Sequence, residues 1–372
     1  MRMMNRMVVA NVVHRPVRSL ISVIAVALEV TMILLIVGFS VGTLNDSRQR
    51  QAGIGADVIV LPPASSAIVG MTGAPAPIRI ADILAKVPHV MSVAPVLMQF
   101  SIGTGGAPEF IYGIDLKTFG GLSGGFTYLH GGPFQGPDDA IVDNVFAQSK
   151  HVKVGDSLEI LNHKFRVAGI VLQGKGARKF LPMATLQEMT GAKDKASAFY
   201  LKLDNPSNVE VVVHEVKAIS GMQQYVTRSM SEYLSMMTPD NIPLLSIFIK
   251  VVIGISVVIG FLVIFQAMYA AVSERTREIG ILKSLGASKL YIVDVVLRET
   301  VLLAIVGVIT GIVLTLVAKL AFRHWIPTLT VVLSGSWLLQ AAMIAISGAV
   351  VGALYPAYKA AQKDPIDALA YE

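Results

Sequence analysis

Four long runs of apolar residues constrain the fold of this chain more than any other feature. The first, Leu20 to Val41, is almost unbroken for about 22 residues, and about 20 apolar residues in a helix cross the hydrocarbon core of a bilayer. Similar runs occur at Leu244–Tyr269, Thr300–Leu320 and Trp337–Tyr355. With 53% hydrophobic residues, 15% charged residues and a mean hydropathy of +0.63, the composition excludes an ordinary soluble enzyme. We therefore expect a polytopic membrane protein.

A cleaved signal peptide and any cysteine-dependent site are disfavoured by the sequence. A cleaved signal peptide would have an apolar part of about 7–15 residues followed by an A-x-A-like site, and the first run is longer and lacks that site. The absence of cysteine excludes a disulfide-stapled domain, a thiolate metal site and a cysteine nucleophile.

The charges indicate how the chain is oriented. Four spans place both termini on one side, and four arginines without an acidic residue precede the first span: Arg2, Arg6, Arg15 and Arg18. The positive-inside rule therefore predicts cytoplasmic termini and an outer segment from about Thr43 to Pro243. The formal net charge of +6 reflects this orientation, so nucleic acid is not an expected partner.

The composition of residues 1–19 favours a cationic helix lying in the lipid interface, which Pro16 would end. An unstructured basic leader is the alternative. The expected organisation is this interfacial segment at 1–19, spans at 20–42, 244–270, 300–321 and 337–356, an extracytoplasmic domain at 43–243, a cytoplasmic helix and loop at 271–299, a short outer loop at 322–336 and a cytoplasmic tail at 357–372.

The outer segment is predicted to be a mixed α/β domain inserted between the first and second membrane helices. Short or alternating apolar runs predict strands at Ala56–Leu61, Val90–Pro95, Phe110–Ile114, Ala140–Val142 and Phe165–Val171. Helical periodicity fits Ile80–Lys86, Asn144–Lys150 and Asn208–Ile219. The glycine-rich stretch Gly120–Gly136 is predicted to be a long loop, either a hinge or an exposed connection.

The sequence offers no catalytic, cofactor or metal site. Gly169–Gly176, GIVLQGKG, has the G-x-x-x-x-G-K spacing of a phosphate-binding loop, but Gly176 occupies the position of the Ser or Thr that holds Mg²⁺. Its I-V-L is typical of a strand interior, so no ATP hydrolysis is expected from this chain alone. The seven histidines form no H-E-x-x-H motif, and no Ser/His/Asp arrangement is evident.

Glu29 lies near the middle of the first run, where a charge costs about 2.5–3.5 kcal/mol on insertion scales. Lys250 in the second run is the charged residue at comparable depth, but it is offset by about 10 Å at 1.5 Å per helical residue. We expect Lys250 to extend toward the interface. Glu29 either hydrogen-bonds a Ser, Thr or Gln of a neighbouring helix, or faces a substrate or a gate.

Small residues four positions apart occur in three of the runs: Gly38 and Gly42, Gly307 and Gly311, and Gly348 and Gly352. This spacing lets helix backbones approach closely. It predicts either a packed bundle or a dimer.

A charged segment, SERTREIGILKSLGAS at Ser273–Ser288, separates the second and third runs. It predicts one amphipathic helix, with Glu274 and Glu278 on one face and an apolar side made by Ile279, Ile281, Leu282 and Leu285. Gly286 supplies a helix stop. The helix either contacts a partner protein or lies on the membrane surface.

This segment, followed by Arg298 and Glu299, resembles the signature of MacB/FtsX-type (type VII) ABC transporter permeases. Two further regions are similar to that family: His14-Arg15-Pro16-Val17-Arg18-Ser19-Leu20 and the tail Tyr355–Ala361 with Asp364-Pro365-Ile366. In the outer segment, Gly55–Val58, Tyr112–Asp115, Val154–Asp156 and Val167–Ile170 are similar to the family's periplasmic core domain. Ala370 departs from the basic residue common in such tails.

The resemblance implies a permease homodimer in a bacterial plasma membrane that works with a separate ABC ATPase dimer, which would hold the ATP and Mg²⁺. It leaves a periplasmic adaptor open. The implied ATPase-coupling positions are Glu274, Arg275, Arg277, Glu278, Gly280, Lys283 and Gly286. The implied function is export of a hydrophobic, amphipathic or lipid-linked cargo by mechanical motion of the outer domain. The alternative is a mechanotransmitter that regulates an external enzyme or sensor and transports nothing.

Overall fold

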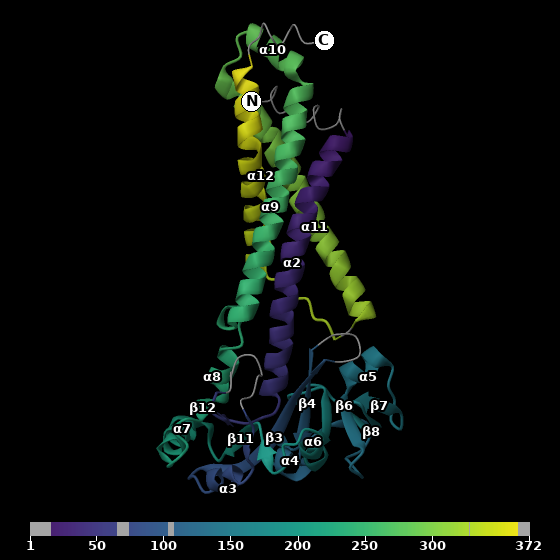
Figure 1. Ribbon diagram of the computed structural model, residues 1–372, viewed down its shortest axis with the longest axis vertical. Coiled ribbons are helices and arrows are strands. Elements are labelled where there is room, and N and C mark those ends of the chain that lie inside the picture. The colour runs from purple at the N-terminus through teal and green to yellow at the C-terminus, as the bar shows by residue number, and fades with distance from the viewer. Residues whose placement is uncertain (1–15, 65–73, 103–107, 327, 364–372) are drawn as a thin grey trace. The chain divides into compact units, whose positions relative to one another are not determined.

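The computed structural model describes residues 16–64, 74–102, 108–326 and 328–363. The chain divides into two compact units. A helical unit contains residues up to Val41, Leu244–Phe322 and the chain from Val331 onward, and a sheet unit contains Gly42–Pro243 with Arg323–Thr330 (Figure 1). The predicted interfacial segment at 1–19 lies outside the described residues except for its last four positions, which are helical.

Four helices are long and apolar enough to cross a membrane, as predicted. They are α2 (Pro16–Ala52), α9 (Pro243–Glu274), α11 (Lys289–Trp325) and α12 (Gly335–Gln362). Each extends beyond its predicted span, and α11 begins inside the predicted loop at 271–299. A nine-residue helix, α10 (Thr276–Ser284), lies between α9 and α11.

Close contact between α2 and α11 organises the helical unit. A Cβ added at Gly307 would lie 2.6 Å from Cβ of Val26, and one at Gly311 would lie 2.7 Å from the carbonyl oxygen of Ala27. The Oγ1 of Thr31 donates a hydrogen bond to the carbonyl of Gly311 at 3.1 Å. Of the two predicted roles, packing within the bundle or dimerisation, these two glycines therefore serve packing within the bundle.

A mixed ten-stranded sheet forms the framework of the sheet unit, in the order β12-β1-β11-β3-β4-β9-β6-β8-β5 with β7 paired to β8. The β4–β9 and β6–β8 pairs are parallel and the others antiparallel. The strands are β1 (Val58–Leu61), β3 (Val90–Ile102), β4 (Pro108–Ile114), β5 (Tyr128–Gly131), β6 (Asp139–Asp143), β7 (Ser157–Ile160), β8 (His163–Val171), β9 (Lys179–Pro182), β11 (Ala198–Leu203) and β12 (Val226–Ser229). A separate pair joins β2 (Ala76–Pro77) to β10 (Lys195–Ala196).

Hydrophobic cores cover both faces of this sheet, which explains the continuous apolar runs. In β1, Val58 and Val60 enter one core while Ile59 and Leu61 enter another, because successive side chains of a strand point to opposite faces. The helices of the unit are α3 (Ile80–Leu84), α4 (Leu116–Ser123), α5 (Asn144–Lys150), α6 (Met183–Met189), α7 (Val209–Ala218) and α8 (Met230–Ser235), with 3₁₀ turns at Pro206–Asn208 and Pro239–Asn241. The predicted mixed α/β fold, its five strands and its three helices are confirmed.

The prediction of one long loop at Gly120–Gly136 is wrong. Helix α4 extends to Ser123 and strand β5 begins at Tyr128. The side chain of Asp115 accepts a hydrogen bond from the N–H of Thr118 and caps α4, and Phe119 and Leu122 are buried in the core. Burial of these two apolar side chains outweighs the low helix propensity of Gly120 and Gly121.

Candidate functional site

The charged segment between α9 and α11 forms two helices instead of the predicted single one. Helix α9 ends at Glu274, and Arg275, at φ −102° and ψ 17°, interrupts the helical backbone before α10 begins. Glu274 and Glu278 therefore lie on different helices, and the expected common face does not form. At the other end, Gly286 has φ +92°, and the N–H groups of Gly286 and Ala287 donate to the carbonyls of Lys283 and Leu282. This is a Schellman motif, so the predicted stop is confirmed.

The apolar residues of α10 divide between two faces. Ile279 is buried and Leu282 half-buried, in a cluster with Ile292, Ala360 and Ala361 of α11 and α12. Ile281 is exposed, and so is Leu285, which leaves 81% of its surface accessible. The predicted single apolar side is therefore wrong, because inward and outward residues alternate around a helix with 3.6 residues per turn.

A buried ion cluster lies where α9 meets α10. Glu299 of α11 accepts a hydrogen bond from Arg18 on one carboxylate oxygen and from Arg275 on the other, both at 2.8 Å. The exposed fractions of the three side chains are 4%, 12% and 11%. Glu274 approaches Arg18 at 4.0 Å. One carboxylate thus joins the first turn of α2, the α9–α10 break and α11.

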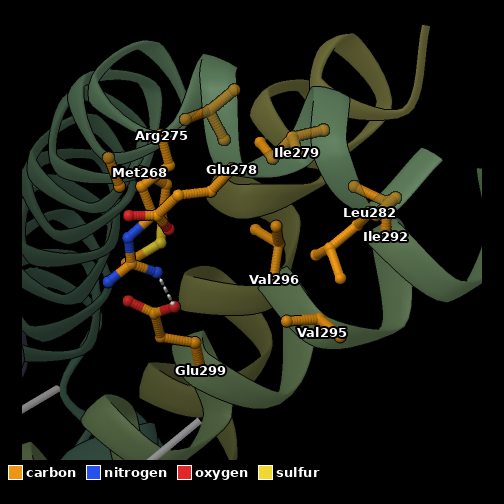
Figure 2. Close-up of a pocket in the computed structure, with 11 residues that line it drawn as sticks. Met268, Arg275, Glu278, Ile279, Leu282, Ile292, Val295, Val296 and Glu299 are labelled. Atoms are coloured by element: carbon orange, nitrogen blue, oxygen red, sulfur yellow. Dashed lines mark hydrogen bonds and ion pairs between the residues drawn. The ribbon is translucent and has the colours of Figure 1, made fainter. Parts of the chain in front are cut away.

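Figure 2 shows a pocket beside this cluster, with Arg275 pointing toward Glu299. Its volume is about 60 Å³, far below the roughly 300–1,000 Å³ of a typical ligand pocket. Its remaining walls are mostly apolar: Met268, Ala271, Val272, Ile279, Leu282, Ile292, Val295 and Val296, with Glu278. The space allows side chains to shift but does not fit a substrate.

The seven positions named from the resemblance separate into outward and inward groups. Glu274, Arg277, Glu278 and Gly286 are exposed. Arg275 lies in the ion cluster, Gly280 is buried, and the Nζ of Lys283 donates to the carbonyl of Ala361 at 3.1 Å and to that of Lys363. The inward residues hold α10 against the ends of α11 and α12, and Arg277, Glu278 and Gly286 are exposed on the other side of this segment.

Glu29 lies on α2 among apolar side chains and is 6% exposed. Its carboxylate rests against Gly260 of α9, where an added Cβ would lie 2.0 Å from Oε2. No described residue hydrogen-bonds its buried Oε1. The expected bond to a polar residue of a neighbouring helix is therefore not formed within the described chain, and Lys250 is exposed.

A second polar cluster surrounds the last turns of α2 in the sheet unit. Arg178 donates to Asp46 at 2.9 Å and to the buried Asp143 at 3.0 Å, and Arg50 also pairs with Asp46. Burial, and secondly the charge of Arg178, lowers the pKa of Arg50 to about 10. Arg50 remains charged at neutral pH.

The glycine-rich sequence that resembles a phosphate loop belongs to the same cluster. The N–H of Gly176 donates to the carbonyl of Arg50 at 2.8 Å, and the Nε of Arg50 donates back to the carbonyl of Gly176 at 3.1 Å. Beside it, the side chain of Gln51 bridges the hydroxyls of Tyr112 and Tyr200, both buried. The segment thus wraps the end of α2. Sequence analysis missed this cluster because its members come from distant parts of the chain.

Comparison with known proteins agrees with this architecture. The family of the MacB-like periplasmic core domain matches residues 19–219, and that of the FtsX-like permease C-terminal region matches residues 250–365. The macrolide export ATP-binding/permease protein MacB of Neisseria gonorrhoeae is 23% identical over 99% of this chain, which spans 60% of that protein. An uncharacterized ABC transporter permease of Methanocaldococcus jannaschii is 28% identical over 59% of this chain and 58% of its own length.

Among solved structures, the periplasmic region of MacB from Actinobacillus actinomycetemcomitans matches 50% of this chain and 94% of its own, with 16% identity and a TM-score of 0.39. The long apolar helices, the inserted sheet unit and the two family matches define the class of this protein as a multi-pass permease subunit of an ABC transporter. The chain belongs to the MacB/FtsX-type family of these permeases.

Proposed function

We propose that this permease converts ATP hydrolysis by a separate ABC ATPase into mechanical motion of its sheet unit, which lies outside the cytoplasm. The observation that carries the proposal is the cluster in which Glu299 holds both Arg18 and Arg275. Through Arg275 and Arg18, this cluster connects the start of α10, the proposed partner-binding helix, with α2, whose last turns belong to the sheet unit. Termini and α10 are cytoplasmic in this proposal, which the positive residues around the start of α2 and along α10 support.

The outward face of α10 and of the turn after it is the proposed docking surface. Leu285, just after α10, and Leu290, in the first turn of α11, leave 81% and 80% of their surfaces exposed, and Arg277 and Glu278 lie on α10. Two large apolar side chains at such exposure, accompanied by charges of both signs, favour a protein partner over anionic lipid, which would attract cations alone. The ATPase dimer and a second copy of the permease are the proposed assembly.

Helix α2 is the proposed transmitting element because it is continuous from Pro16 to Ala52. Its first turn bonds Glu299 through Arg18, and its last turns bond the sheet unit through Asp46 and Arg50. A continuous helix resists bending and stretching because each turn is hydrogen-bonded to the next. In this proposal a displacement of α10 passes into α2, whose last turns contact Asp143 of β6 and Gly176 through Arg178 and Arg50.

The proposed cargo is a hydrophobic, amphipathic or lipid-linked molecule that is already outside or in the outer leaflet. Macrolide export, which the name of the Neisseria relative states, supports this class. The second candidate is a mechanotransmitter that regulates an external enzyme or sensor. The bonds between the last turns of α2 and Arg178 and Gly176 favour this candidate, because a mechanotransmitter needs a mechanical connection and no path for cargo.

ATP turnover separates the two candidates. The permease would be reconstituted in nanodiscs with its ATPase, and turnover measured with macrolides, lipopeptides and lipid-linked molecules. Export predicts saturable stimulation by one of these classes. Turnover that ignores every cargo but responds to an external protein would support the mechanotransmitter, and turnover unaffected by the permease itself would contradict both.

A further inference from the structure

The carboxyl group of Glu29 has a setting that the proposed coupling does not use. Only 6% of the surface of Glu29 is exposed, and its Oε1 has no hydrogen-bond partner among the described residues. An ionised carboxylate in hydrocarbon without a partner is far more costly than a neutral acid. The geometry therefore favours the protonated form.

No other titratable group faces Glu29 from the helices around it. On α2 the stretch 19–43 contains Glu29 as its sole titratable residue, and the facing stretches 253–267 of α9, 300–315 of α11 and 341–353 of α12 contain none. Within these described stretches, therefore, no positive side chain is placed to neutralise this carboxylate. Glu299 provides the contrast, because it is equally buried yet bonded to two arginines.

Gly260 makes room for the carboxyl in the seam between α2 and α9. A Cβ at this position would lie 2.0 Å from Oε2 of Glu29 and 2.7 Å from its Cδ. The close contact is possible because glycine lacks that atom. An ionised Glu29 would need water or a cation at this contact, and neither fits while the helices remain in contact.

The same seam opens into a groove toward the α10 end of the helices. The groove is lined by Ile21 of α2 and Val263 of α9, and Gln266, Arg18 and Glu274 are its polar residues. Val263 is three residues from Gly260, which is about 4.5 Å along a helix. Water in the groove would thus reach within one helical turn of the Glu29 contact.

We propose that Glu29 is a proton-binding site within the membrane, and that its proton holds the α2–α9 seam closed. Loss of the proton to the groove would charge the carboxylate, draw water toward it and separate α2 from α9 at Gly260. The proton leaves as hydronium or to buffer, so no other reactant is needed. The site would couple the position of α2 to pH on the α10 side of the membrane.

Infrared spectroscopy of the full-length protein in nanodiscs tests the protonation. At neutral pH we expect a protonated-carboxyl C=O band that is absent from Glu29→Gln and present in Glu188→Gln, which changes an exposed acid of the sheet unit. Above its midpoint the band should fall about tenfold per pH unit. A band that Glu29→Gln leaves unchanged, or one that persists at all pH values, would overturn the proposal.

Thiol labelling tests the opening of the α2–α9 seam. Because the protein contains no native cysteine, only an introduced thiol is labelled. Ser256 is buried on α9 one turn from Gly260, and Ser256→Cys is nearly isosteric. The labelling rate with a water-soluble maleimide would be measured in this variant and in the same variant carrying Glu29→Gln. Dividing the first rate by the second cancels the pH dependence that comes from ionisation of the thiol itself. We expect this ratio to rise about tenfold or more over two pH units above neutrality. A constant ratio would contradict the seam opening.

Discussion

The Nη2 of Arg18 donates to the Oε1 of Glu299 at 2.8 Å, although the two residues are 281 positions apart in the chain. The other carboxylate oxygen accepts from Arg275. Because the three side chains are nearly buried, each charge depends on its partners for stability. The beginning of α2 and the α9–α10 break are therefore held by a single side chain of α11.

Replacing Glu299 with Gln should destabilise the helical unit by about 3–5 kcal/mol, because it removes the negative charge that two nearly buried guanidinium groups share. Thermal unfolding in detergent measures the effect. The matched control is Asp294→Asn, which removes a half-exposed pair with Arg298 on the same helix and should cost under about 1 kcal/mol. Equal effects of the two variants would contradict a special role for Glu299.

Reversing the charge of Glu274 and Glu278 together, each to Lys, should reduce cargo-dependent or partner-dependent ATP turnover while the protein remains inserted and folded. Both side chains are exposed, and exposed charges contribute little to stability. The same reversal at the exposed Glu188 and Glu210 of the sheet unit provides the control. Full activity of the first double variant in cells would show that these acids do not contact the ATPase.

The sequence predicted the elements better than it predicted their contacts. Strand β1 was evident because VIVL is a continuous apolar run, whereas the four-residue β9 and β12 contain charged residues that mask the pattern. The break at Arg275 lacks the Pro or Gly that usually marks one. The Arg18–Glu299 pair depends on how two distant helices pack, which local periodicity does not encode.

Substituting Ala for Gly307 should destabilise the helical unit by about 1–3 kcal/mol, because the added Cβ meets Val26 at 2.6 Å. Gly348 offers a control on α12, since the nearest atom to an added Cβ lies at 4.0 Å. There Ala should stabilise by up to about 1 kcal/mol through its better helix propensity. Thermal unfolding of both variants should therefore shift in opposite directions; shifts of the same sign would contradict the close α2–α11 contact.

Stability of the sheet unit should depend on Asp139 at low pH. Burial raises the pKa of this carboxyl, but hydrogen bonds from the backbone N–H groups of Gln135 and Gly136 and from Arg166 outweigh it and hold the pKa below its ordinary value of 3.8. Its contribution is thus present above about pH 4, the unfolded value, and is lost as pH falls through the folded pKa.

Hydrogen exchange of β6 and β8 in the full-length protein, corrected for intrinsic rates, measures this contribution. The wild type should lose protection as pH falls below about 4, and Asp139→Asn should be less stable at neutral pH by about 1–3 kcal/mol with a flatter acid dependence. The exposed Asp138→Asn is the control. Parallel pH profiles for wild type and Asp139→Asn would contradict the assignment.

Contact between Leu285 and an ABC ATPase tests the coupling proposal most directly. The protein contains no cysteine, so a photoreactive label can be attached at Leu285→Cys alone, and at the 70% exposed Met91→Cys of the sheet unit as a control. The proposal predicts a cross-link from residue 285 to a subunit carrying a phosphate-binding loop, identified by mass spectrometry, and none from residue 91. A cross-link from residue 285 to lipid alone, in a complex that hydrolyses ATP, would contradict it.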